Sequence, residues 1–479
     1  MIGTATPSDS PSRAWIVALV GGAGIAGLAA ATGPGVLAAA GLSALIAMLV
    51  LVRQPSIAIY LFVFIVYLNV PAILVRFHGL PVLIGGAVLG LLLIPIAARL
   101  VGRQPIAVGP ALPAMLAYLL ALALSALVSG AQASSLDIVL LFVAEGLVIY
   151  LLVTAAISSS AQLRGALWAM VIAATVMGTL SVMQELTGAY QNDFFGFAQV
   201  EGIPEIGDRP RLAGPIGEKN RYAQVLIMAL PIAVMLGVGV RSRVTQLLAA
   251  ATSAAILAGI VLTFSRGAAI GLVALAVAAA FLRVVSWRRM AMFGVMALVI
   301  VAAVAPAFIT RIDTLRGVEG LLSEESVAEP DGAIVGRLTS NLAAMHTFVE
   351  HPLLGVGPGQ YFERYSAVAA NELGLRYFET SRRAHNLWLE VAADTGIAGL
   401  VTFSAILVVT VAGLVRVRRR WQYANPAHAA LVAGLLLSIV AYLVTGMFLH
   451  LSYQRYFWLL IALASVAVIV LTRDESRRA

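Results

Sequence analysis

Long apolar runs dominate the chain, and they do not alternate with polar residues as a half-buried strand would. Each run is close to the length that a helix needs to cross the hydrocarbon core of a bilayer, about 20 residues. Candidate spans lie at about residues 14–32, 36–52, 56–75, 81–98, 111–129, 136–156, 164–187, 221–240, 244–264, 266–284, 289–309, 386–415, 427–449 and 453–472. The first two are short and rich in Gly and Ala, so the pattern predicts about 12–14 spans.

Composition leads to the same class of fold. Hydrophobic residues make up 61% of the 479 residues, charged residues only 11%, and the mean hydropathy is +0.96. A soluble domain cannot bury that much apolar surface, whereas helices in lipid satisfy their own backbone hydrogen bonds. We therefore expect an all-α, polytopic integral membrane protein rather than a membrane β-barrel. The chain has no cysteine, which excludes disulfides and thiolate chemistry.

Arginines in the short loops set the orientation of the bundle. One side carries Arg99, Arg103, Arg164, Arg241, Arg243, Arg283, Arg288, Arg416, Arg418, Arg419 and Arg420. The positive-inside rule makes that side the cytoplasm, with both termini on it. The predicted units are an N-terminal bundle at 1–187, a first outer loop at 188–220, helices at 221–309, a large outer loop at 310–385, and C-terminal helices with a short tail at 386–479. Within the large loop, residues 336–362 predict an amphipathic helix that ends at a Pro and Gly-rich turn.

Three predicted spans place a basic residue at the outer membrane boundary: Arg221, Arg266 and His385. The planar fork of arginine makes paired, charge-assisted hydrogen bonds to phosphate, so this arrangement suits a lipid pyrophosphate. The alternative is that both arginines only extend to lipid headgroups and anchor their helices.

His385 is a candidate general base. An imidazole with an ordinary pKa near ~6.5 is largely neutral in the outer compartment and can accept a proton from a sugar hydroxyl. Arg382 and Arg383 would lower that pKa further if they point the same way. The alternative is an interfacial histidine that only caps its helix.

Other residues indicate less. His346 and His351 have no acidic or cysteine partner at metal-ligand spacing in the sequence, so we expect no metal site. The segment Gly355–Gly359, GVGPG, lacks the Lys and Ser/Thr of a phosphate-binding loop and predicts a turn. Asp137 and Glu145 suit either a proton path or pairing with an arginine inside the bundle.

Four motifs resemble one family of bacterial membrane enzymes. HNLWLEVAADTGIAGL, from His385, fits the pattern H-N-x9-G-x-x-G after a long outer loop. The others are RLAGPIGEKNRYAQVLIMALP from Arg211, LTFSRGAAIGL from Leu262 and HPLLGVGPGQYF from His351. Together they resemble the O-antigen ligase and O-antigen polymerase superfamily, over about residues 140–450.

The resemblance implies a C-type membrane glycosyltransferase that moves a glycan from undecaprenyl pyrophosphate to an acceptor sugar hydroxyl with inversion. His385 matches the family's proposed base, and Arg221 and Arg266 match its pyrophosphate-binding arginines. Their neighbours Lys219, Asn220, Arg382, Arg383 and Asn386 are candidate supporting residues. The expected partners are the lipid-linked donor, an acceptor glycan or glycolipid and the bilayer, without cofactor, metal or nucleic acid. The expected location is the bacterial inner membrane, with the site on the periplasmic face.

Several alternatives stay open at this point. The number of spans favours a polymerase slightly over a ligase, and the sequence does not separate them. A transporter or flippase of lipid-linked glycans would also suit so many spans, although its polar groups should lie near the bilayer midplane. A protein O-oligosaccharyltransferase is disfavoured because no soluble domain follows the last predicted span.

Overall fold

The computed structural model describes residues 48–201, 210–284, 332–374, 382–450 and 454–476, together with residues 288 and 295. Within these ranges, seven helices are long and apolar enough to cross a membrane, or eight if a pair bent by 55° counts as one span. The seven are Ile84–Val101, Gln132–Ala156, Ser160–Thr187, Arg243–Leu262, Leu387–Ala424, Pro426–Gly446 and Arg455–Glu475. This confirms the all-α, polytopic membrane class.

Not every predicted span has this form. The candidate span at 14–32, all of 289–309 except residue 295, and most of 36–52 lie outside the described residues, so the total of about 12–14 stays a prediction. Leu112–Val128 and Arg266–Phe281 are apolar but shorter helices. The expected span at 56–75 is the bent pair, Pro55–Tyr67 and Val70–His78.

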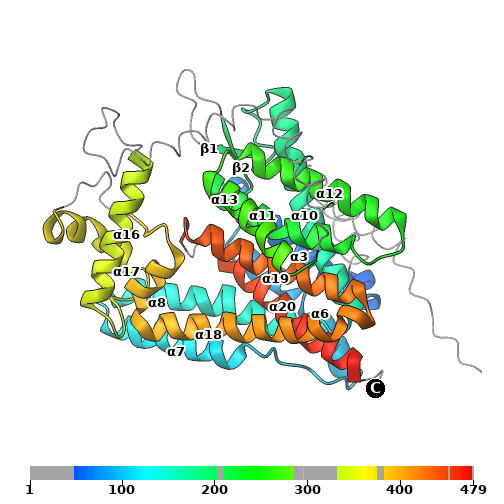
Figure 1. The fold of residues 1–479 in the computed structure, drawn as a ribbon. Coiled ribbons are helices and arrows are strands. Elements are labelled where there is room, and N and C mark those ends of the chain that lie inside the picture. The colour runs from blue at the N-terminus through cyan, green and yellow to red at the C-terminus, as the bar shows by residue number, and fades with distance from the viewer. Residues whose placement is uncertain are drawn as a thin grey trace, which may run out of the picture.

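Figure 1 shows how the described elements are arranged. The first part consists of α3 (Pro55–Tyr67), α4 (Val70–His78), α5 (Ile84–Gly90), α6 (Leu93–Val101), α7 (Leu112–Val128), α8 (Gln132–Leu141), the π-helix η1 (Phe142–Val148), α9 (Ile149–Ala156) and α10 (Ser160–Thr187). The second consists of β1 (Gln199–Glu201), β2 (Arg211–Gly214), α11 (Lys219–Leu236), α12 (Arg243–Leu262), α13 (Arg266–Phe281), α16 (Gly332–Glu350), α17 (Gln360–Ala367), the π-helix η3 (Val368–Glu372), α18 (Leu387–Ala424), α19 (Pro426–Gly446) and α20 (Gln454–Ser476).

Polar caps explain where several of these helices begin. The first turn of a helix has amide groups without intrahelical partners, and a Ser or Asn side chain before it accepts from them. Ser159, Ser242, Ser265, Asn386 and Asn425 do so for α10, α12, α13, α18 and α19. Each cap thus stops a polar connection and starts an apolar helix at a defined residue.

The core of the bundle forms around α11, α19 and α20, most of whose side chains are buried. Hydroxyl groups join these helices: Ser438 donates to the carbonyl of Met228, and Tyr67 of α3 donates to the carbonyl of Val225. Small residues allow the closest approach, since a Cβ on Gly259 of α12 would lie 2.8 Å from the Cα of Gly178 in α10.

Both predicted outer loops contain secondary structure. In the first, β1 and β2 form a two-stranded antiparallel sheet in which Val200 lies opposite Leu212. In the second, α16 is followed by a turn and α17, which confirms the predicted helix and its Pro and Gly-rich end. Figure 1 shows α16 and α17, in yellow, together at one end of α18. A small separate core of Ala and Tyr side chains, with Tyr361 and Tyr365 at its centre, holds this unit against Ala384 and Ala393.

Candidate functional site

Three helix N-termini carry the residues that the sequence singled out. Arg221 lies in the first turn of α11, Arg266 is the first residue of α13, and His385 immediately precedes Asn386, the cap of α18. A helix N-terminus presents unpaired amide groups and the positive end of the helix dipole, so each start favours an anion.

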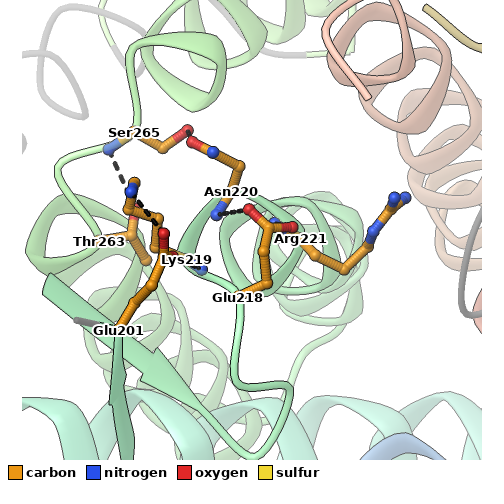
Figure 2. Close-up of polar contacts among 7 residues, drawn as sticks. All are labelled: Glu201, Glu218, Lys219, Asn220, Arg221, Thr263 and Ser265. Atoms are coloured by element: carbon orange, nitrogen blue, oxygen red, sulfur yellow. Dashed lines mark hydrogen bonds and ion pairs between the residues drawn. The ribbon is translucent and has the colours of Figure 1, made fainter. Parts of the chain in front are cut away.

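The starts of α11 and α13 are joined directly. The hydroxyl of Ser265 donates to Oδ1 of Asn220 at 2.9 Å, and the carboxylate of Glu218 accepts from the amides of Asn220 and Arg221 (Figure 2). Because Ser265 precedes Arg266 and Asn220 precedes Arg221, this bond sets the spacing of the two arginine-bearing turns.

Lys219 occupies a different position from its neighbours. Its ammonium group forms an ion pair with Glu201 of β1 at 2.7 Å, and its amide donates to the same carboxylate. Lys219 therefore fastens α11 to the first loop in this structure.

The guanidinium of Arg221 is buried between α11 and the segment that follows α19. Nη1 donates to the carbonyl of His450 at 2.7 Å and to Oε1 of Gln224 at 3.0 Å. Gln224 is held in turn by Thr445, whose hydroxyl accepts from its amide. Figure 2 shows the Arg221 side chain extending away from Lys219 and Asn220. Burial of a cation costs free energy unless polar groups form hydrogen bonds with it. The carbonyl of His450 and Oε1 of Gln224 supply these bonds and hold the Arg221 guanidinium in place.

His385 lies in a constrained loop beside this arginine. Its φ is 49°, the left-handed region that non-glycine residues seldom adopt and that often marks functional positions. Its ring meets the ring of His450 edge to face, with centroids 5.7 Å apart. Nδ1 of His385 is buried and has no hydrogen-bond partner among the described residues. The imidazole is therefore positioned without an internal acceptor or donor at that atom.

Burial and four arginines lower the pKa of His385 to about 4. Desolvation is the largest cause, followed by the charges of Arg382, Arg337, Arg221 and Arg383. The expectation that Arg382 and Arg383 lower this pKa agrees with their placement. The pKa of His450 is also lowered, by burial and then by Arg221. Both imidazoles are neutral near pH ~7 as a result.

The loop that carries His385 is tied down on both sides. Arg383 pairs with the buried Glu390 at 3.1 Å, and the other carboxylate oxygen accepts from the amide of Ala384. From α16, the hydroxyl of Ser340 donates to the carbonyl of Ala384. These contacts fix the residue before His385, and Asn386 fixes the one after it by capping α18.

The large loop adds an arginine that the sequence interpretation did not place in the site. Arg337 of α16 lines a small pocket with Asn220, Ser265, Gly267 and Phe448. Its neighbour Gly336 lies against Arg382, whose Nη1 would be 2.8 Å from a Cβ at that position. Nothing in the sequence distinguishes Arg337 from the other arginines of this loop, because only the packing of α16 brings it here. The sequence interpretation also did not include Glu390 of α18 or His450, which follows α19.

Two of the sequence motifs interlock. The backbone of α18 is non-helical at Gly396, with φ 62° and ψ −162°. Backbone groups on both sides of the break bind the Pro and Gly-rich turn: the amide of Ile397 donates to the carbonyl of Pro352, and the carbonyl of Asp394 accepts from the amide of Gly357. The Asp394 carboxylate accepts from the amides of Gly359 and Tyr361. The predicted turn at GVGPG is confirmed, and it attaches the large loop to α18.

Two smaller expectations can be compared with the structure. Glu145 forms an ion pair with Arg455 at 3.6 Å, which is the pairing alternative for that residue. The expectation that His346 has no acidic partner is wrong. In the structure, carboxylate oxygens of Glu350 and Glu372 lie 3.9 Å and 3.3 Å from its Nδ1. Glu350 lies one turn away on α16, while Glu372 arrives from η3, a contact that only the fold of the loop creates.

Taken together, the helix starts and the large loop surround a neutral imidazole with guanidinium groups. Such a site is suited to an anionic group with a proton-bearing hydroxyl beside it, since the arginines balance negative charge and the imidazole accepts a proton. Of the residues expected from the sequence, Arg221, Arg382, Arg383 and His385 are brought close enough to interact, and Arg266 is tied in through Ser265 and Asn220.

Comparison with known proteins agrees with this architecture. Residues 251–404 match the family model described as O-antigen ligase, a range that includes Arg266, the large loop and His385. No curated protein matches the chain at a significant level. The family match over residues 251–404 supports the resemblance to O-antigen ligases and O-antigen polymerases, and the all-α membrane fold agrees with it.

Proposed function

We propose that this protein transfers a glycan from undecaprenyl pyrophosphate to the hydroxyl group of an acceptor sugar, with His385 as general base. The family match at residues 251–404 supports glycan transfer in general. The observation that carries the finer proposal is the environment of His385, a neutral imidazole facing the charges of Arg382, Arg337, Arg221 and Arg383. A base and a set of fixed cations are the two elements that such a transfer requires.

In the proposed step, the acceptor hydroxyl oxygen attacks the anomeric carbon of the donor glycan and forms the new glycosidic bond. The bond between that carbon and the pyrophosphate oxygen breaks on the opposite face, which inverts the configuration. The hydroxyl proton passes to the His385 imidazole and then to solvent, while the electron pair leaves with undecaprenyl pyrophosphate. The pyrophosphate is already an activated leaving group, so positioning and charge balance supply most of the catalysis.

The arginines would bind the donor pyrophosphate. Arg221 is held rigidly by His450 and Gln224, and Arg266 is positioned by the Ser265–Asn220 hydrogen bond. Rigid placement strengthens binding because the conformational entropy of the arginine side chain is lost during folding and not when the donor binds. The N-termini of α11, α13 and α18 add partial positive charge beside them.

We place the site on the periplasmic face of the bacterial inner membrane, with both chain termini in the cytoplasm. The support is the distribution of arginines: Arg241 and Arg283 follow the C-terminal ends of α11 and α13, and Arg418 lies near the C-terminal end of α18, opposite to the starts of these helices. Donor and acceptor glycans would then meet in an aqueous compartment beside the large loop.

A transporter is the rival in another functional class, and the break in α18 is the feature that would suit it, since transporters use interrupted helices to bind substrates. Here the carbonyl groups at the break are occupied: Gly357, Val356 and the Ser125 hydroxyl donate to Asp394 and Ala393. The break thus serves as an attachment point for the loop, which favours the enzyme.

The test uses purified protein in nanodiscs with a labelled undecaprenyl-pyrophosphate-linked repeat unit, and products are resolved by size. A ladder of repeats without a second acceptor, absent with His385→Ala, is the result expected of a polymerase. If product forms only when lipopolysaccharide core is added, the protein is a ligase. Absence of product from folded wild-type protein under both conditions would overturn the proposal.

A further inference from the structure

A second cavity is lined in part by the segment that leads into α11. Its volume is about 350 Å³, within the size range of small-molecule sites, and its lining includes Asn69, Arg76, Ile84, Glu145, Gln199 and Arg455. Pro215 and Ile216 also line it, a few residues before Arg221 in the chain. Neither Arg221 nor His385 is part of its wall.

Two irregularities in otherwise apolar helices supply two of the polar groups of this cavity, Asn69 and Glu145. The chain breaks between α3 and α4 at Asn69, which has φ 64°, and the two helices are bent by 55°. Glu145 lies in the π-helix η1, inside the candidate span Gln132–Ala156. Both features cost conformational energy and recur at functional positions. Here both of them point polar side chains at one cavity.

Asn69 is nearly inaccessible, with 3% of its surface exposed. Its amide nitrogen donates to the carbonyl of Pro215 at 2.7 Å, while Oδ1 has no partner in the part of the chain that the structure describes. A buried, unsatisfied carbonyl oxygen costs free energy unless a ligand or water donates to it. Asn69 therefore offers an acceptor to a hydroxyl-bearing ligand.

Cationic groups flank this acceptor. Arg76, in the last turn of α4, is exposed, and no described carboxylate lies within ion-pair distance of it. Arg455 pairs with Glu145, yet its Nε is buried and lacks a partner among the described residues. The cavity thus carries one net positive charge and free hydrogen-bonding capacity, which together favour an anionic and hydroxylated ligand.

One rim of the cavity is built to contact lipid. Val82 and Leu83 are 80% and 84% exposed, and they precede Ile84–Val101, a candidate span in which only 17% of the residues are buried inside the protein. Apolar side chains this exposed are expected to face acyl chains in a membrane. A ligand with a lipid tail could therefore enter from the bilayer between these residues and α4.

We propose that this cavity binds the acceptor of the transfer, an amphipathic glycolipid with an anionic group next to its lipid tail. The inference rests on the proposed function and deepens it. The anionic group lies at Arg76, the sugar hydroxyls face Asn69 and Arg455, and the glycan passes over Ile216 toward His385. A carrier-linked repeat and a phosphorylated lipopolysaccharide core share this chemistry, so the site serves either kind of acceptor.

The experiment fills the cavity without disturbing the helix. A Cβ at Gly85 or at Gly86 meets no atom within 4 Å, but only Gly85 lines the cavity. Gly85→Phe is the test variant and Gly86→Phe the matched control; Arg76→Gln is paired with Arg241→Gln in the same way. Initial rates are measured against donor and against acceptor separately. The acceptor is lipopolysaccharide core in one series. In the other series the acceptor is a carrier-linked repeat in which a carbon replaces the oxygen between the anomeric carbon and the pyrophosphate. This repeat can accept a glycan but cannot donate one.

We expect Gly85→Phe and Arg76→Gln to raise the acceptor KM about tenfold or more, with the donor KM unchanged and both controls like wild type. The series that gives product identifies which glycolipid is used. An unchanged acceptor KM in both variants, in a wild-type background that transfers glycan, would overturn the inference alone. A raised donor KM would overturn it as well and assign the cavity to the donor. Lack of transfer by wild type would instead overturn the proposed function on which the inference depends.

Discussion

His385 and His450 meet edge to face with ring centroids 5.7 Å apart, and the carbonyl of the same His450 accepts a hydrogen bond from Arg221. His450, which follows α19, therefore contacts both the candidate base and a candidate donor-binding cation. The pair is linked through packing and a backbone group rather than through a carboxylate. The imidazole stays neutral because its burial, and then the charges of Arg382, Arg337, Arg221 and Arg383, lower its pKa.

Replacement of His385 by Ala should remove the base and leave the fold intact, since the ring makes no hydrogen bond through Nδ1 in the described structure. We expect turnover to fall by roughly 10²–10⁴-fold. His450→Phe is the control, because it keeps an aromatic edge against His385 and the carbonyl that holds Arg221. It should retain most activity. Comparable losses in both variants, or normal turnover with His385→Ala, would contradict the assignment of the base.

The pH dependence of transfer should report the lowered pKa of His385. The base must be unprotonated, so a pKa of about 4 extends activity to lower pH than an ordinary histidine would. In kcat/KM, which reflects the free enzyme, the acidic limb should lie near that value. In kcat it should lie at higher pH, because bound pyrophosphate offsets the arginine charges and raises the pKa. Arg382→Gln should shift the limb of kcat/KM upward. Identical limbs near pH ~6.5 in both profiles would exclude His385 as this base.

The class of fold was predictable because the hydrophobic effect acts on local sequence. Runs of apolar residues and polar caps such as Ser265 and Asn386 define where helices begin, whatever surrounds them. The motif positions His385, Arg221 and Arg266 were predictable for the same reason, since each lies at the boundary between a polar loop and an apolar helix. Local patterns also indicated the turn at Gly355–Gly359.

The parts that were not predictable depend on contacts between distant segments. Arg337 joins the site only because α16 packs beside Asn220 and Ser265. Lys219 is not directed to the site, because its ammonium pairs with Glu201 of β1, a strand that the sequence pattern did not predict. Glu372 reaches His346 through the fold of the large loop. In each case the sequence offers several charged residues that could make the contact, and only the tertiary structure determines which one does.

Arg266→Lys tests whether the fork of the guanidinium is used. A lysine keeps the charge and can still extend to lipid headgroups, but it cannot make two parallel hydrogen bonds to a phosphate. If Arg266 binds pyrophosphate, the lysine variant should lose donor kcat/KM by roughly 10–100-fold, nearly as much as Arg266→Ala. Full activity of the lysine variant would support the alternative of a simple membrane anchor. Donor titrations in nanodiscs distinguish the two, with Arg241→Lys as a control for a loop arginine.

The break at Gly396 should be intolerant of any side chain, and this would show that the large loop and α18 form one structural unit. Its φ of 62° and ψ of −162° lie in a region that is essentially restricted to glycine, and a Cβ there would be 2.4 Å from the Leu353 carbonyl. Gly396→Ala must therefore distort the turn that Asp394 holds, with a cost of about 1–3 kcal/mol from backbone strain alone. We expect a lower melting temperature in detergent and weaker donor turnover, because Ala384 and His385 are held by the same loop. Gly130→Ala is the control, since its Cβ would meet no atom within 4 Å. A Gly396→Ala protein as stable as the control would mean that the loop and α18 are not coupled at this point.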